Sequence, residues 1–553
     1  MLCLKLGFEK NTSASEWTAI DGVWRYGTCF VAPYRHRRIA ASSLRCGQRI
    51  AFVIRERSAV SGAPSDVSAI GDVDDDAFDG ALREVAAWPL NFVCLVVDHA
   101  RRCAEIRSGE WGSAPLYALA RGGMLWADWD AARLYPLLRR GLDLPRAILA
   151  LVEIGYPYSS QTIFEELVHL TERSVARWEA VRGHLEIEYP RPVPRLRPRK
   201  IREGADVLAA FDSLMREAVG LWTDPGQIVA TELSGGIDSS AVATALAINS
   251  DAPVRSYGLI MPGTDGVFQA ERRDELAARF GLLDYARDCE EFLPFAADGE
   301  RIGAGSTIPW SEFYYDAVAA LCREARQDGV DVLFTGAGGD EISTIMPDEE
   351  PDRDIELGED DPPALPPFLT VRGIEAYEDA CRRHWPAPGA AVERSCIEAA
   401  ATNADVFLRH GLWPAYPYCA PRLVNFCRSL PLMWRQGREL QRLYLRRHGC
   451  TDRVARPEIC ETFADVMTMA LQRNASVLTS LFQESRLAAS GLVDREILHR
   501  SHAAFRATGE QKWKDAFVEL AVLELTVRAV EQSTSSVASH PPSPDDVMPF
   551  IPS

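Results

Sequence analysis

The chain has 553 residues, of which 47% are hydrophobic and 25% charged, so two or three domains with sizeable cores are expected. Its formal net charge of −19 disfavours nucleic acid or an anionic membrane as the main partner. The 13 cysteines show no CxxC pair or zinc spacing, and neither a signal segment nor a run of about 18 apolar residues occurs, which predicts a soluble cytoplasmic protein with reduced thiols.

Residues 1–190 have the pattern of a β-rich domain. Short apolar runs such as FVCLVVD (Phe92–Asp98) and GMLWADWD (Gly123–Asp130) are separated by turn-forming residues. The proline- and arginine-rich stretch YPRPVPRLRPRK (Tyr189–Lys200) interrupts regular structure and predicts a domain boundary.

Between residues 201 and 531, helix and strand patterns alternate at first and then become mainly helical. Helices are predicted at Ala205–Leu221, Ser239–Ile248, Gln269–Phe280 and Ser311–Arg326, and strands at Gln227–Leu233, Val254–Ile260 and Val330–Gly336. The alternation predicts an α/β domain whose parallel sheet is covered by helices on both faces.

Two further segments differ in composition from their surroundings. The acidic, proline-rich stretch Pro347–Pro367 is typical of a mobile surface insertion, although a substrate-gating loop also fits its position after a motif described below. The Ser- and Pro-rich residues 532–553 predict a disordered tail.

The loop LSGGIDSS (Leu233–Ser240) lies between a predicted strand and a predicted helix. Its glycines let backbone N–H groups close around an anion, and the helix N-terminus adds partial positive charge. It lacks the Gly-Lys-Ser/Thr sequence of a Walker loop. Asp238 would repel a bound phosphate unless a cation lay between them, so Mg²⁺ is expected there.

A second glycine-rich turn, LFTGAGGDE (Leu333–Glu341), ends a later strand and supplies Asp340. If the two strands are neighbours at the switch point of a parallel sheet, Asp238 and Asp340 meet where ligands bind. Either aspartate alone could be an ordinary helix cap. The two loops together favour a shared magnesium site.

SGGIDSS and TGAGGDE resemble the paired signatures of the asparagine-synthetase-like ATP pyrophosphatases. In that family ATP is cleaved between its α- and β-phosphates, a carboxylate becomes an acyl-adenylate, and an amine attacks it to form an amide. The resemblance implies that Asp238 and Asp340 bind Mg²⁺. It also implies ATP contacts from Leu233, Ser234, Gly235, Gly236, Ser239 and Ser240 in the first loop, and adenine contacts from the backbone of Leu259 (in SYGLIMPG), Thr335 and Gly336.

Residues 1–190 resemble the glutamine amidotransferase half of asparagine synthetases, a β-rich sandwich of the Ntn type. The resemblance rests on Gly112–Leu138 and Thr162–Tyr189. Glutamine hydrolysis there requires a cysteine as the first residue, whereas this chain begins Met1-Leu2-Cys3. Leucine hinders removal of the initiator methionine, so we expect a degenerate domain in which Cys3 is a plain buried thiol. The attacking amine then comes from elsewhere.

A ligase of this kind without glutaminase chemistry resembles two groups, the lasso-peptide macrolactam synthetases and the β-lactam synthetases. Both close rings within one substrate, so proximity supplies much of the rate. Ala337 stands where glutamine-dependent and β-lactam enzymes carry glutamate or tyrosine, which weakens the β-lactam interpretation. A peptide N-terminal amine, with a pKa near 8, needs less activation. The stretch GRELQRLYLRRHG resembles the helical tail of lasso cyclases, but amphipathic core helices fit it equally.

The family's catalytic lysine is missing, since lysines occur only at positions 5, 10, 200, 512 and 514. In the matching stretch, RVARPEICETF (Arg453–Phe463), Arg456 is the candidate replacement, with a different geometry from lysine. Structural roles are expected for Glu458 and Cys460, and for His410 and His448. Glu312, Tyr314 and Tyr315 are candidates to line the substrate crevice.

The sequence therefore predicts an ATP- and Mg²⁺-dependent, AMP-forming carbon–nitrogen ligase, most like a lasso-peptide cyclase. Its substrate would be a precursor peptide, and a leader-binding protein and a leader peptidase are the implied partners. The alternatives are a β-lactam-forming or other natural-product amide ligase, and a non-catalytic homologue that binds nucleotide or peptide.

Overall fold

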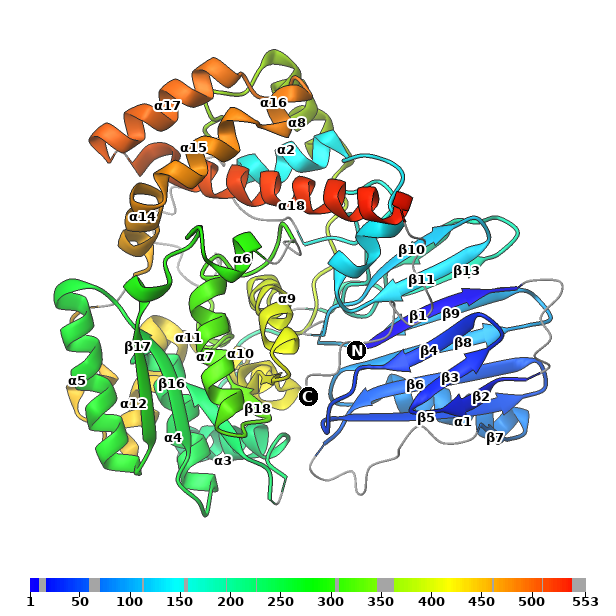
Figure 1. The fold of residues 1–553 in the computed structure, drawn as a ribbon. Helices are drawn as coiled ribbons and strands as arrows, with labels where there is room; N and C mark the ends of the chain where they lie inside the picture. Colours follow the sequence, from blue (N-terminus) through cyan, green and yellow to red (C-terminus); the bar gives the residue numbers. More distant parts are fainter. Residues whose placement is uncertain are drawn as a thin grey trace.

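The computed structural model describes residues 1–8, 16–58, 70–111, 114–153, 158–194, 196–224, 226–303, 308–345, 363–459, 462–509 and 511–539. Figure 1 shows three parts: a sandwich of strands in blue and cyan, a parallel sheet with its helices in green and yellow, and a layer of C-terminal helices in orange and red. No helix in these described ranges is both long and apolar enough to cross a membrane.

The N-terminal part consists of two seven-stranded sheets. One has the order β12-β10-β11-β1-β4-β3-β2 and the other β14-β13-β9-β8-β6-β5-β7. The strands are β1 (Leu2–Gly7), β2 (Thr18–Ile20), β3 (Val23–Tyr26), β4 (Cys29–Pro33), β5 (Ile39–Cys46), β6 (Arg49–Glu56), β7 (Gly71–Asp72), β8 (Phe92–Asp98), β9 (Cys103–Ser108), β10 (Tyr117–Arg121), β11 (Met124–Asp128), β12 (Val168–His169), β13 (Val175–Glu179) and β14 (Leu185–Glu188). Pairing is antiparallel except between β5 and β7.

Alternating side chains of both sheets face each other and form one core. Leu4 and Val31 of the first sheet join Phe52 and Leu95 of the second in a single buried cluster. Three helices belong to this part: α1 (Asp75–Ala86), η1 (Ala131–Leu137) and α2 (Leu144–Glu153). The predicted β-rich sandwich is therefore present, whereas its kinship with a glutaminase stays a prediction.

The second part is built on a five-stranded parallel sheet with the order β17-β16-β15-β18-β19. Its strands are β15 (Val229–Glu232), β16 (Arg255–Ile260), β17 (Leu283–Asp288), β18 (Val332–Phe334) and β19 (Trp413–Ala415). Three of them lie within the predicted strands. Neither β17 nor β19 was predicted. The region after residue 367 is mainly helical, as expected, and β19 adds a strand of three residues that pairs with β18.

Helices cover both faces of this sheet, as the alternation predicts. On one side lie α3 (Val207–Gly220), α4 (Ile237–Asn249) and α12 (Glu439–Arg447), and on the other α7 (Tyr315–Gln327) and α9 (Arg394–Arg409). The further helices of this part are α5 (Gly263–Phe280), η2 (Cys289–Phe292), α6 (Glu300–Gly303), η3 (Glu341–Ser343), η5 (Pro417–Cys419), α10 (Pro421–Arg428), α11 (Leu432–Arg435), η6 (Gln436–Arg438) and α13 (Asp452–Ala455).

The C-terminal helices share a core with the N-terminal part. They are α8 (Val371–Arg383), α14 (Ala464–Arg473), α15 (Ala475–Gln483), α16 (Arg486–Ala489), α17 (Arg495–Thr508), η7 (Gln511–Trp513) and α18 (Lys514–Ser539). Leu478 and Leu520 pack in one cluster with Leu134 and Ile148. The boundary expected near residue 190 thus separates the sheets but not the cores, because α18 packs on η1 and α2.

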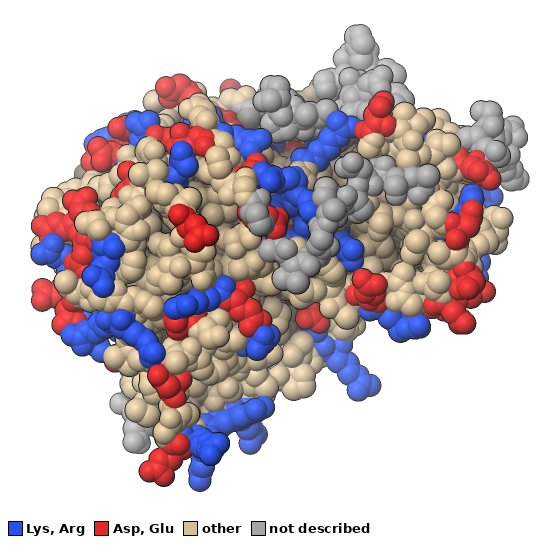
Figure 2. All heavy atoms as spheres, turned by 90° about the horizontal axis from the view of Figure 1, so that it is seen from below, with Lys and Arg blue, Asp and Glu red and all other residues tan. Residues whose placement is uncertain are grey.

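Two predicted segments fall largely outside the described residues. These are most of the acidic insertion (346–362) and the end of the tail (540–553). Helix α18 continues to Ser539, past the helix end expected near Glu531. On the face shown in Figure 2, acidic and basic side chains are interspersed rather than separated by sign.

Candidate functional site

The first glycine-rich loop connects β15 to the N-terminus of α4. Ser234 and Ser239 lie side by side with their Oγ atoms 2.9 Å apart, and Ser239 Oγ also accepts the Ser234 N–H. Ser240 Oγ donates to the carbonyl of Gly236. Gly235 adopts φ +82°, a backbone conformation that favours glycine. The hydroxyls therefore fold the loop before any ligand is present.

Helix α5 holds this loop from outside. Gln269 donates from Nε2 to the carbonyls of Ser234 and Leu259, 2.7 Å each, and its Oε1 accepts the Met261 N–H. Arg272 donates to the Gly235 carbonyl. The sequence analysis assigned Gln269 only to a helix, because a side chain that links two loops has no local signature.

The second glycine-rich turn follows β18, which pairs directly with β15. Its glycines are required by close approach: a Cβ on Gly336 would lie 2.7 Å from the Ser239 nitrogen, and one on Gly339 2.3 Å from Asp238 Cγ. Gly338 adopts φ +97°. The expectation that the two strands are neighbours is confirmed by this pairing, and the two loops are in contact.

The two predicted metal-binding aspartates, Asp238 and Asp340, both form ion pairs with Arg438. This arginine donates from Nη1 to Asp238 Oδ2 at 2.9 Å and pairs through Nη2 with Asp340. The side chain of Asp238 is 15% exposed and that of Asp340 62%. Arg438 therefore places a cation between two carboxylates that are 102 residues apart in the chain.

Arg438 precedes α12 and has an unusual backbone. Its φ is +60°, in the left-handed region that non-glycine residues avoid. In the same helix Gln441, fully buried, donates from Nε2 to the carbonyl of Gly339 at 2.8 Å. Helix α12 is thus a third element of the site, and the sequence analysis had quoted its residues only as part of a helical tail.

Asp238 is poorly neutralised by the protein alone. Its pKa is raised to about 7, mainly by burial; Arg438 acts in the opposite direction, and the negative charge of Asp340 adds to the rise. Its Oδ1 is buried, and no described residue donates a hydrogen bond to it. A buried carboxylate oxygen without a donor, beside a second carboxylate, fits an oxygen-binding cation such as Mg²⁺.

No group of three or more His, Cys, Asp or Glu able to hold a metal ion occurs in the described part of the chain. Two carboxylates are the usual protein contribution where substrate phosphates and water complete the Mg²⁺ sphere.

A cavity of about 540 Å³ opens beside these loops. Of the predicted nucleotide-binding residues, Leu233, Ser234, Gly236, Asp238, Ser239, Leu259 and Gly336 line it. Gly235, Ser240 and Thr335 do not, nor does Asp340. Thr335 instead donates its N–H to the Ala415 carbonyl, and the Ser240 hydroxyl donates to the Gly236 carbonyl inside the loop. Among the lining residues without a predicted role are Glu232, Asn403, Arg438 and Phe463.

Arg456, the predicted catalytic cation, is not among the residues that line the cavity. Its Nη2 contacts both carboxylate oxygens of Glu439, at 2.6 and 2.7 Å. Of the crevice candidates, Glu312 and Tyr314 line the cavity, whereas Tyr315 is buried in the core beneath it.

The remaining candidates have unremarkable surroundings. His410 contacts Glu300 and His448 contacts Asp212, and Glu458 is exposed. Cys460 lies outside the described residues.

Cys3 is buried in β1 of the sandwich. Burial and the nearby Asp128 raise the pKa of its thiol well above the usual value. Such a thiol is protonated at neutral pH and is a weak nucleophile.

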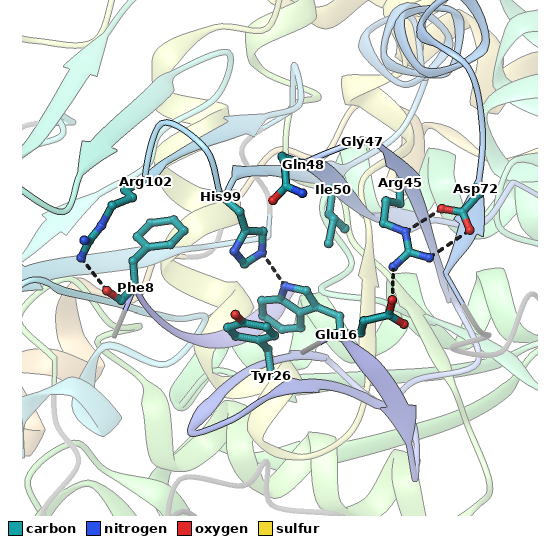
Figure 3. A pocket seen from close by; sticks show the side chains of 11 residues that line it. Phe8, Glu16, Tyr26, Arg45, Gly47, Gln48, Ile50, Asp72, His99 and Arg102 are labelled. Carbon is teal, nitrogen blue, oxygen red and sulfur yellow. Dashed lines mark hydrogen bonds and ion pairs between the residues drawn. The ribbon is translucent and has the colours of Figure 1, made fainter. Parts of the chain in front are cut away.

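A second cavity, of about 570 Å³, lies in the sandwich and is shown in Figure 3. Two of its polar groups pair within the cavity: Trp17 Nε1 donates to His99 at 2.9 Å, and Arg45 pairs with Asp72 and Glu16. Arg102 donates to the Phe8 carbonyl. None of the residues predicted to be functional from the sequence lines it.

Comparison with known proteins gives one family match. Residues 210–350 match the family described as asparagine synthase, which supports an ATP-dependent carbon–nitrogen ligase domain in this part of the chain. No curated protein matches the chain. Among solved structures, the U34-tRNA thiolase NcsA from Methanococcus maripaludis with its 4Fe–4S cluster is similar over 55% of this chain and 80% of that one, at 12% identity. Its TM-score of 0.23 is too low to support an argument.

Proposed function

We propose that the protein forms an amide bond by adenylating a carboxylate with ATP, releasing pyrophosphate and then AMP. The observation that carries this proposal is the convergence of Asp238 and Asp340 on one cation beside the hydroxyl-rich loop and the cavity. A carboxylate is a poor electrophile, and adenylation gives it a good leaving group.

The residues divide the work between binding and charge neutralisation. Backbone N–H groups and hydroxyls of residues 234–240 would hold the phosphates at the N-terminus of α4. Bound Mg²⁺ would offset the charge of the departing pyrophosphate. Arg438 lines the cavity and is the cation nearest to both aspartates, so it fills the role that the missing lysine leaves open better than Arg456.

The finer proposal is ring closure of a lasso-type precursor peptide, in which the N-terminal amine attacks an adenylated Asp or Glu side chain. Two observations support an amine that does not come from glutamine. The thiol of Cys3 is buried and protonated, and Ala337 lines the cavity with only a methyl group. A leader-binding protein and a leader peptidase belong to this proposal as partners.

The test is incubation of the protein with ATP, Mg²⁺ and a candidate core peptide. We expect AMP and pyrophosphate together with a peptide mass lower by about 18 Da, one water, as an intramolecular amide requires. Glutamine added in place of the peptide should not be hydrolysed. ATP binding without AMP formation across a panel of peptides would instead favour a non-catalytic nucleotide-binding protein.

A further inference from the structure

Glu232 occupies an unusual position at the end of a buried strand. Side chains alternate along β15, so Glu232 points to the same face as Ala230. Ala230 packs in an apolar cluster with Ala319, Leu321 and Cys322 of α7. A carboxyl group on this face is destabilising unless something in the cavity compensates for its desolvation.

Glu232 lines the cavity, and no hydrogen bond to its carboxylate is seen among the described residues. Its pKa is raised to about 7, first by burial and then by the negative charge of Glu312. No cation among the described residues therefore offsets the charge of this carboxylate.

Glu312 reaches the same cavity from the segment before α7. The Tyr314 N–H donates to its Oε1 at 3.0 Å, and the buried Arg301 donates to its backbone carbonyl. Burial raises the pKa of Glu312, while Arg301 acts against that rise. These contacts fix the position of Glu312. The Tyr314 N–H binds its Oε1 and not its Oε2.

The surroundings of the two carboxyls are mostly apolar. Val318, Leu321 and Phe463 line the cavity with them, and so does Ala337 at the turn that carries Asp340. The two glutamates therefore lie on the same cavity as the proposed phosphate loop but on the α7 side of the sheet. A cationic group that is part of a larger, partly apolar molecule fits this combination.

We infer that Glu232 and Glu312 form the binding site for the substrate's attacking amine and accept its protons. This inference rests on the proposed ligase function and adds to it the class of nucleophile, a primary ammonium group rather than free ammonia or an amide.

The proton balance requires two acceptors. An ammonium R–NH₃⁺ first gives one proton to a carboxylate and becomes R–NH₂. Its lone pair then forms the N–C bond, the C–O bond to the adenylate breaks, and that electron pair leaves on the phosphate of AMP. The nitrogen loses a second proton, which the other carboxylate accepts. A pKa of about 7 for Glu232 is close to that of a peptide N-terminal amine, so the first transfer is nearly balanced.

The test measures binding directly and does not depend on turnover. Phenylalaninamide, a free α-amine without a carboxylate, is titrated into the full-length protein by calorimetry at pH 7, with N-acetylphenylalaninamide as the uncharged probe. The variants are Glu232→Gln and Glu312→Gln, and the matched control is Glu16→Gln in the sandwich cavity. Thermal unfolding verifies that each variant is folded.

We expect the wild type to bind the amine and not the acetylated probe. Glu232→Gln and Glu312→Gln should each weaken amine binding by at least about tenfold, while Glu16→Gln leaves it unchanged. Equal binding of both probes, unaltered binding in both variants, or no amine binding by the wild type would each overturn the inference. Amine binding without AMP formation in the peptide assay would overturn the ligase proposal alone.

Discussion

Two cavities among the described residues have nearly the same volume, about 570 Å³ in the sandwich and about 540 Å³ beside the parallel sheet, but differ in their internal chemistry. In the sandwich cavity Arg45 is paired with Asp72, and Trp17 donates to His99. In the other cavity, Asp238 Oδ1 has no donor among the described residues. Buried polar groups are normally satisfied, so an unpaired carboxylate oxygen that lies on a cavity beside a second carboxylate favours a ligand site, whereas cavity volume alone does not.

The largest difference between the cavities should appear on removing the unpaired carboxylate. Asp238→Asn is expected to lower AMP formation by at least about 100-fold, because the site loses the charge that holds the metal and phosphates. The measurement is AMP release with the candidate peptide. His99→Ala serves as the counterpart in the sandwich cavity and should change AMP release by less than about twofold. Equal losses of AMP release in Asp238→Asn and His99→Ala would show that the two cavities do not differ in function.

The two candidate cations can be separated in the same assay. Arg438→Gln should lower AMP formation by about 10- to 100-fold, since it removes charge-assisted hydrogen bonds at the site. Arg456→Gln breaks only a half-exposed pair with Glu439 and should change it by less than about threefold. A larger loss for Arg456→Gln would restore the assignment made from the sequence.

The contact between the two loops can be tested by adding one methyl group. Gly339→Ala would place a Cβ 2.3 Å from Asp238 Cγ, so the loops must separate, and the free energy of unfolding should fall by about 1–3 kcal/mol. At Gly141, a residue outside both loops, a Cβ would meet nothing within 4 Å, and the same substitution should stay within about 0.5 kcal/mol. Denaturant unfolding measures the free energy of unfolding of both variants. Equal values for Gly339→Ala and Gly141→Ala would argue against the close approach of the two loops.

A further expected effect concerns the dependence of stability on pH. The folded protein holds a proton on Glu232 up to about pH 7, whereas an unfolded glutamate releases it near 4.5. The folded state therefore binds more protons between these values, and the wild type loses stability as pH rises through this window. Glu232→Gln removes this term, so its advantage over the wild type should grow from pH 4.5 to 7, reach about 3 kcal/mol, and then stay constant.

Paired urea unfolding curves at pH 4.5, 6 and 8 measure this difference. A constant difference, or one that shrinks as pH rises, would show that the pKa of Glu232 is not raised in the folded protein. The stabilisation would also show that the loss of amine binding in this variant is not caused by unfolding.

The sequence by itself was sufficient to predict the two glycine-rich loops and the strands that precede them. SGGIDSS and TGAGGDE have local reasons for their composition: a tight turn, a helix N-terminus and a backbone that must approach closely. The meeting of Asp238 with Asp340 followed from one topological rule, that ligands bind where parallel strands end at a switch point. The strand β19 and the continuation of α18 to Ser539 did not follow, because pairing and packing with distant segments stabilise them.

Only the tertiary structure decided which side chains complete the site. Arg438 lies 200 residues after Asp238, and Gln269 acts on the first loop from a neighbouring helix. Glu232 and Glu312 reach one cavity from segments far apart in the chain. Their residue types are ordinary in the sequence, and their chemistry arises from burial and from charges brought near by the fold. Local composition determines what a loop can bind, whereas pKa values and ion pairs depend on distances in space, which the order of residues along the chain does not contain.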